Sequence, residues 1–166
     1  MKNSGAKGRG IHARRESSAE RHLTRMADSR ILDRELAHGL ARLGLGVDIA
    51  LHGLVRLPKL ASFAGGMEKE FAKTVLPGLL VYATGCGIAV GEAIVGSLLV
   101  AGLFLRPTLV AGMLLMILLL FGVSLLEKWD VAGMQLTYLA FYAALLATAS
   151  WDRFSVDGWL RKRRTP

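Results

Sequence analysis

Three long apolar runs dominate the pattern of the chain. The runs from Pro107 to Leu126 and from Val131 to Ala149 contain no charged residue, and the run from Leu76 to Leu105 contains a single one, Glu92. A helix needs about 20 apolar residues to cross the hydrocarbon core of a bilayer. Each run is long enough, so three transmembrane helices are predicted.

A fourth helix is expected ahead of these runs, where leucines alternate with polar residues. At about 100° per residue, its ionisable side chains fall on one third of the helix, and Leu, Val, Ile, Ala and Gly fill the rest. We interpret it as transmembrane helix 1, with its polar stripe turned into a bundle. Pro58 should bend or end it, because proline lacks an N–H donor. Arg42 and Arg56, near its ends, belong to this stripe; the alternative is that they extend to the membrane surface. The four expected helices cover about residues 36–58, 75–105, 107–127 and 130–150, with a loop over residues 61–75.

Basic residues are concentrated at both ends of the chain. The first 35 residues hold nine Lys/Arg against five Asp/Glu, and residues 151–166 hold five against two. By the positive-inside rule, both termini are expected in the cytoplasm. The formal net charge of +8 then reflects topology and contact with anionic lipids. No aromatic residues interleave with the N-terminal basic residues, so no nucleic-acid partner is expected.

The predicted organisation has three parts. Residues 1–35 form a basic extension, residues 36–150 the four-helix membrane domain, and residues 151–166 a basic tail. The extension lacks the apolar segment of a signal peptide. Either a short interfacial helix begins at the capping-box sequence SSAE (Ser17–Glu20), or the chain is disordered through about Arg15.

Few residues suggest chemistry. Cys86 is the single cysteine, so no disulfide cycle can run within the chain, and it is expected to act as a small buried residue. His38 and His52 both lie on helix 1 and cannot face each other across a haem. The sequence contains neither a recognisable metal-ligand spacing nor a Gly-rich phosphate loop. We therefore expect no metal and no cofactor bound by a recognisable motif, and any redox centre would come from a partner.

Glu92 is the residue that most needs an explanation. A carboxylate at the centre of a bilayer costs about 2.5–3.5 kcal/mol on insertion scales and requires a compensating partner. Small residues share its helical face and would let helix 1 approach closely. We hypothesise that Glu92 meets helix 1 near Asp48, His52 and Arg56, with Asp48 competing for the same cation. The cluster is either an ion-pair clamp that fixes the two helices, or a site for a proton or a quinone headgroup.

Three stretches resemble the DoxX family of small bacterial four-helix membrane proteins: "LARLGLGVDIALHGLVRLPKL", "VLPGLLVYATGCGIAVGEAIVGSLLVAGLFLRPTLVAGMLLMILLLFG" and "LAFYAALLATASWDRFSVDGWLRKR". The shared features are a helix ending in H-G-x-x-x-L-x-K, a glutamate followed by G-x-x-L-x-x-G-L-x-x-R, and an ending like R-x-S-x-D. The resemblance covers roughly Leu36 to Arg163. It implies a bacterial inner-membrane location. Family members include the membrane subunit of a thiosulfate:quinone oxidoreductase, and others look like accessory or assembly partners of redox enzymes. By this likeness His52, Lys59, Glu92 and Arg106 are the positions of interest.

The predicted fold is an all-α integral membrane four-helix bundle with a basic cytoplasmic N-terminal extension. Two functions stay open: the membrane subunit of a quinone-linked oxidoreductase or electron-transfer complex, with quinone as its ligand, or a non-catalytic structural or assembly subunit of a larger membrane complex. A small transporter is less favoured, because broken, repeat-related helices are not evident. The expected partners are the lipid bilayer and either other membrane proteins or further copies of the chain. The candidate polar, quinone or proton site consists of Asp48, His52, Arg56, Lys59, Glu92 and Arg106.

Overall fold

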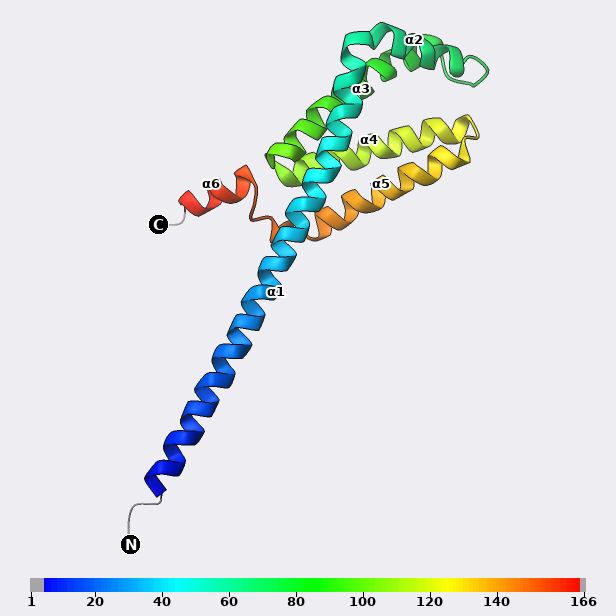
Figure 1. Cartoon of the computed structure of the whole chain (residues 1–166). Helices are drawn as coiled ribbons and strands as arrows, with labels where there is room; N and C mark the ends of the chain where they lie inside the picture. Colours follow the sequence, from blue (N-terminus) through cyan, green and yellow to red (C-terminus); the bar gives the residue numbers. More distant parts are fainter. Residues whose placement is uncertain (1–4, 165–166) are drawn as a thin grey trace. The chain divides into compact units, whose positions relative to one another are not determined.

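The protein is helical throughout most of the part that the computed structural model describes, residues 5–164 (Figure 1). Side chains are described for residues 25–160, except Ala27, and for Arg163. Short 3₁₀ turns occupy Leu57–Lys59 and Ala149–Trp151. The α-helices are α1 (Gly5–Arg56), α2 (Leu60–Glu70), α3 (Gly78–Ala101), α4 (Leu105–Leu125), α5 (Trp129–Ala147) and α6 (Val156–Arg164).

The chain divides into two units, residues 1–37 and residues 38–166. In the first unit α1 is already helical from Gly5, so neither a helix start at Ser17 nor a coil through Arg15 is found. The sequence from Ile11 to Ala37 contains no glycine or proline, and these are the residues that most disfavour a helix interior. The described side chains of this unit are exposed, apart from the half-buried Glu35.

Three helices of the second unit, α3, α4 and α5, are long and apolar enough to cross a membrane. This confirms three of the four predicted spans and indicates a membrane protein. A left-handed glycine, Gly102 with φ of 65°, ends α3, where glycine carries no steric penalty. The backbone N–H groups of Gly102 and Leu103 donate to carbonyls of the last turn of α3, as in many helix C-caps.

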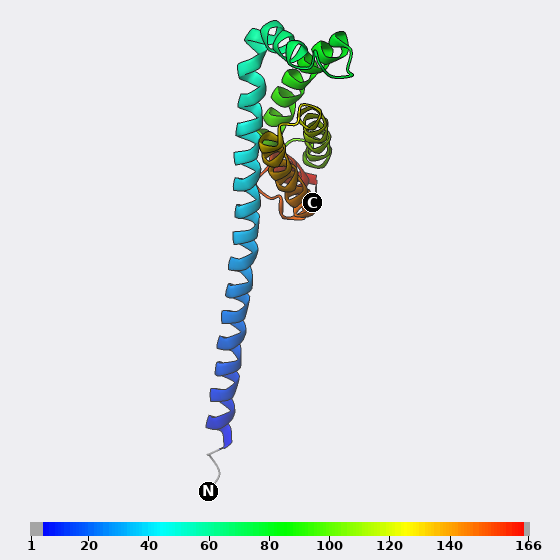
Figure 2. The same ribbon diagram turned by 90° about the vertical axis from the view of Figure 1, so that its right-hand side faces the viewer.

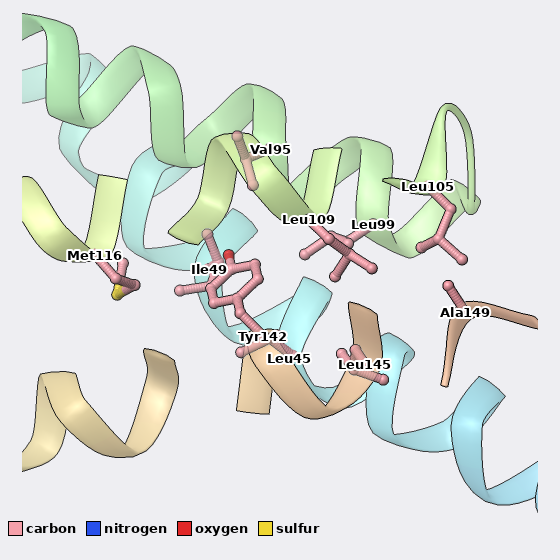
Figure 3. Close-up of a cluster of buried hydrophobic side chains, with 10 residues drawn as sticks. All are labelled: Leu45, Ile49, Val95, Leu99, Leu105, Leu109, Met116, Tyr142, Leu145 and Ala149. Atoms are coloured by element: carbon pink, nitrogen blue, oxygen red, sulfur yellow. The ribbon is translucent and has the colours of Figure 1, made fainter. Parts of the chain in front are cut away.

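The apolar core of the second unit forms where α1, α3, α4 and α5 meet (Figure 3). Tyr142 on α5 is fully buried there. A Cβ at Gly112 on α4 would lie 2.2 Å from the Tyr142 ring, so only glycine leaves room for this ring. The core residues are Leu45, Ile49, Val95, Leu99, Leu105, Leu109, Met116, Tyr142, Leu145 and Ala149.

The part of α1 from residue 38 onward packs directly against α3 (Figure 2). A Cβ at Gly96 would lie 2.1 Å from the backbone nitrogen of Ala50, and a Cβ at Gly53 would lie 2.1 Å from that of Ala93. Contacts this short require glycine on each side of the crossing. The predicted close approach of helix 1 to the small-residue face of α3 is therefore confirmed.

The expected loop over residues 61–75 is largely a helix, α2, which was not predicted. Its Ala64 is buried, as is Phe71 directly after its end. A Cβ at Gly85 would lie 3.2 Å from the Ala64 Cα, so α2 packs on the first half of α3. Burial of one apolar face stabilises this short helix despite its internal Gly65 and Gly66. As predicted, the chain bends near Pro58: α1 ends at Arg56, and a 3₁₀ turn precedes α2.

Candidate functional site

An ion pair between a partly exposed arginine and a buried carboxylate joins α1 to α3 near the middle of α3. Glu92 is 3% exposed, and its Oε2 accepts a hydrogen bond from Nη1 of Arg56. The Arg56 side chain is 27% exposed, and its guanidinium lies 4.7 Å from the centroid of the Phe63 ring on α2. The carboxylate is thus compensated by a cation of helix 1, as the sequence analysis hypothesised, and Arg56 stays partly exposed.

The pair lies where α1 breaks. Arg56 is the last residue of α1, and the 3₁₀ turn Leu57–Lys59 with Pro58 separates it from α2. The first segment that packs on α3 is therefore discontinuous: α1 covers the second half of α3 and α2 the first.

An apolar cavity of about 440 Å³ borders the pair between α2, α3 and α4. Arg56 lies at its wall together with Phe63. Leu80 and Phe121 also line it and are more than half exposed, so the cavity opens on the outer apolar surface of the helices. Lys128 and Glu70, which form an exposed ion pair, lie at its rim. Its other apolar lining residues include Met67, Phe71, Val81, Ile88, Leu119 and Leu126.

Asp48 and His52 lie together on α1, and Asp48 is hydrogen-bonded to α5. The Tyr138 hydroxyl donates to Asp48 Oδ2 at 2.7 Å. Nδ1 of His52 lies 2.9 Å from the carbonyl oxygen of Asp48 and 3.7 Å from its Oδ1. Asp48 therefore accepts its hydrogen bond from a tyrosine, and the expected competition with Glu92 for one cation is not seen.

An open surface hollow connects these residues to the ion pair. Asp48, His52, Arg56 and Lys59 line it, together with Phe63. His52 and Lys59 are exposed. Because Arg56 lines both the hollow and the apolar cavity, its guanidinium separates a water-accessible polar surface from an apolar compartment.

Arg106 lies apart from the other five candidate residues. It is exposed in the first turn of α4, past the C-terminal end of α3, whereas the cavity lies along the N-terminal half of α3. At about 1.5 Å per helical residue, the length of α3 beyond Glu92 alone separates them by more than 10 Å. Arg106 borders a different hollow with Asp152 and Asp157.

A second buried ion pair, which the sequence analysis missed, involves Arg42. Arg42 is 4% exposed, which contradicts the alternative that it extends to the membrane surface. Its Nε lies 3.8 Å from Asp152 Oδ1, Nη2 donates to the Phe154 carbonyl at 2.8 Å, and Nη1 donates to the carbonyls of Leu99 and Val100. The guanidinium thereby joins α1, the end of α3 and the C-terminal segment.

The R-x-S-x-D ending completes this junction. The Ser155 hydroxyl donates to Asp152 and accepts the backbone N–H of Gly158 at 2.9 Å. Asp157 Oδ2 accepts the backbone N–H of Leu105 at 2.9 Å, which satisfies a donor at the start of α4. Asp157 of the motif and the nearby Asp152 were the residues from which a structural cluster could have been predicted here.

Comparison of the chain with protein-family models, with curated proteins and with solved structures finds no match. Among the residues with described side chains, no three His, Cys, Asp or Glu residues are grouped closely enough to hold a metal ion.

Proposed function

We propose that the chain is an integral membrane subunit, similar to the DoxX family, that serves a quinone-linked oxidoreductase or electron-transfer complex. The quinone occupies the cavity between α2, α3 and α4, with its ring beside Arg56. One observation carries the proposal: Arg56, which is bonded to the buried carboxylate of Glu92, forms part of the wall of an apolar cavity that opens among apolar side chains.

The cavity suits an apolar ring that bears a few hydrogen-bond acceptors. Its volume of about 440 Å³ falls in the range of about 300–1,000 Å³ usual for small-molecule sites, which are mostly apolar with a few polar groups that fix orientation. A quinone has two carbonyl acceptors and an apolar tail. A guanidinium has five N–H donors, and the bond to Glu92 uses the Nη1 nitrogen, so the remaining N–H groups can donate to a quinone carbonyl.

Proton supply follows from the position of Arg56 and Glu92. Reduction of a quinone to a quinol takes up two electrons and two protons. The electrons come from the redox centre of a partner protein. Glu92 passes the two protons, one after the other, past its partner Arg56 toward the quinone oxygens, and it is reprotonated each time from the polar hollow that Arg56 and His52 line. A buried carboxylate bonded to a residue that lines an apolar site is suited to such transfer.

The same proposal includes a topology. The part of α1 from residue 38 and the three apolar helices cross the bacterial inner membrane, with both termini in the cytoplasm. Single cysteines placed at Ser4 or Thr165 in a Cys86→Ser background should be labelled by a membrane-impermeant thiol reagent only after the membrane is opened. Labelling of intact cells at either position would rule out this orientation.

The second candidate is a non-catalytic structural or assembly subunit, and one observation favours it. Exposed apolar residues recur every three or four positions along α1, the spacing of a helix-packing stripe. Another membrane helix can cover this stripe, and the Arg56–Glu92 pair then acts only as a clamp. The stripe consists of Leu40, Leu43, Val47, Leu51 and Leu54.

Bound quinone tests the first candidate. Gly122 lines the cavity, and a Cβ there would lie 3.3 Å from the Phe71 ring, so Gly122→Leu should fill the cavity. Gly133→Leu is the matched control, because nothing lies within 4 Å of a Cβ at Gly133. After purification in mild detergent, solvent extraction and chromatography should find near-stoichiometric quinone in the parent and in Gly133→Leu, and at least fivefold less in Gly122→Leu. Equal quinone in all three proteins would refute the cavity assignment.

Glu92→Gln separates the two candidates, because it keeps the shape and hydrogen bonding of the side chain and removes its titration. With the partner proteins identified by co-purification, a relay predicts normal assembly and reduced quinone-linked turnover. Normal assembly with unchanged turnover contradicts the relay and leaves the clamp.

A further inference from the structure

We propose that α6 is an interfacial anchor that binds anionic phospholipid headgroups through its exposed apolar and basic face. The proposal is independent of the quinone assignment. It concerns the other end of the membrane helices, and it specifies a lipid surface as the partner of the C-terminal segment.

Hydrogen bonds fix α6 at the end of the membrane-spanning helices. The Asp157 backbone N–H donates to the Gly102 carbonyl at 3.1 Å, and its carboxylate accepts the Leu105 N–H at 2.9 Å. Gly102 and Leu105 belong to the short turn between α3 and α4, both long enough to cross a membrane. Such a turn lies at the membrane surface, so the start of α6 lies there too.

A surface helix of a soluble protein buries its apolar residues, whereas α6 exposes apolar residues. Gly158 is buried against the chain, and a Cβ there would lie 2.7 Å from the Arg153 carbonyl oxygen. Val156, Trp159 and Leu160 are 39%, 50% and 40% exposed. A short helix that turns its apolar residues outward at a membrane surface is typical of interfacial amphipathic anchors, and tryptophan is enriched at this depth.

Charge identifies the lipid. Residues 151–166 hold five Lys/Arg and two Asp, and both aspartates already have partners within the protein, Arg42 for Asp152 and Leu105 N–H for Asp157. The Arg163 guanidinium lies 3.7 Å from the centroid of the Trp159 ring, so a cation and an aromatic ring occupy the same face. Basic clusters next to membrane helices attract anionic headgroups. The occupant is therefore an anionic phospholipid surface.

Fluorescence of Trp159 in nanodiscs tests the proposal on the full chain. Trp129→Phe and Trp151→Phe leave Trp159 as the only tryptophan. We expect its emission to shift to shorter wavelength, and its quenching by brominated lipid to at least double, when phosphatidylglycerol is added to phosphatidylcholine. High salt should reduce this response, because it screens exposed charges.

Charge variants establish the cause. Replacing Arg161, Lys162 and Arg164 with glutamine should abolish the response to phosphatidylglycerol. The same replacement of three basic residues in the N-terminal extension, Lys2, Lys7 and Arg9, should leave it unchanged. If brominated lipid fails to quench Trp159 both with and without phosphatidylglycerol, the proposal is overturned. An acidic protein would then be the partner of this face of α6. A loss of response with the N-terminal variant would overturn the proposal as well.

Discussion

Removing Arg56 should destabilise the protein more than removing Glu92, although the two side chains form one ion pair. The Glu92 side chain is 4% exposed and that of Arg56 is 27% exposed. In Arg56→Gln, a carboxylate is left without its cation in the protein interior. In Glu92→Gln, the remaining guanidinium keeps its position over the Phe63 ring and can turn toward the polar hollow.

The magnitude follows from the burial of the carboxylate. Breaking a buried pair by removing one partner costs about 3–5 kcal/mol. This range applies to Arg56→Gln, because Glu92 is the buried member of the pair. For Glu92→Gln we expect about 1–2 kcal/mol, the usual scale of one weakened hydrogen bond to a charged group.

Unfolding by SDS titration in mixed micelles measures both variants, with tryptophan emission and the reaction of the single cysteine, Cys86, as two probes. The double variant Arg56→Leu/Glu92→Leu should recover most of the loss. Equal losses in the two single variants would refute the reasoning.

Three further predictions use the same unfolding assay. Gly96→Ala places a Cβ within 2.1 Å of a backbone nitrogen of α1 and should cost about 2–3 kcal/mol, whereas Gly87→Ala, with nothing within 4 Å, should not destabilise. Tyr142→Phe should leave stability unchanged or raise it by about 1–2 kcal/mol, because the buried hydroxyl has no hydrogen-bond partner in the described part of the chain; a clear loss would show that this hydroxyl is bonded. Arg42→Met should cost about 3–5 kcal/mol and the exposed Arg106→Met less than about 0.5 kcal/mol, and similar effects of the two would contradict the buried junction.

The sequence predicted those features that depend on the residues of a single helix. Charge-free runs predicted α3, α4 and α5, because only their length and composition matter. The link between Glu92 and Arg56 could be anticipated since a carboxylate in an apolar helix needs a cation, and the polar stripe of helix 1 supplies a small number of candidates. Small residues beside Glu92 indicated which helix could come close enough.

Contacts between distant segments could not be predicted in this way. The partners of Arg42 could not be predicted, because the C-terminal end of α3 and the segment around Asp152 reach it only through the tertiary fold. Asp48 is bonded by Tyr138, 90 residues further along the chain. Helix α2 was missed because two adjacent glycines and a charged end resemble a loop, and its burial against α3 outweighs this local preference.

The break between α1 and α2 links the proposed chemistry to the fold. An unbroken α1 would carry Arg56 in a helix interior, and α2 would not lie across the first half of α3 to form a wall of the cavity with α4. Instead the bend at Pro58 places the last side chain of α1 against Glu92, and Phe63, just beyond the bend, lines the cavity beside it. The sequence argument against a transporter depended on unbroken helices, so this break removes part of that argument. The break also means that one contact serves both proposed roles of the Arg56–Glu92 pair. This contact ties α1 to α3, and it also brings a charged group to the apolar cavity. Only a measurement of bound ligand or of turnover can therefore distinguish the two roles.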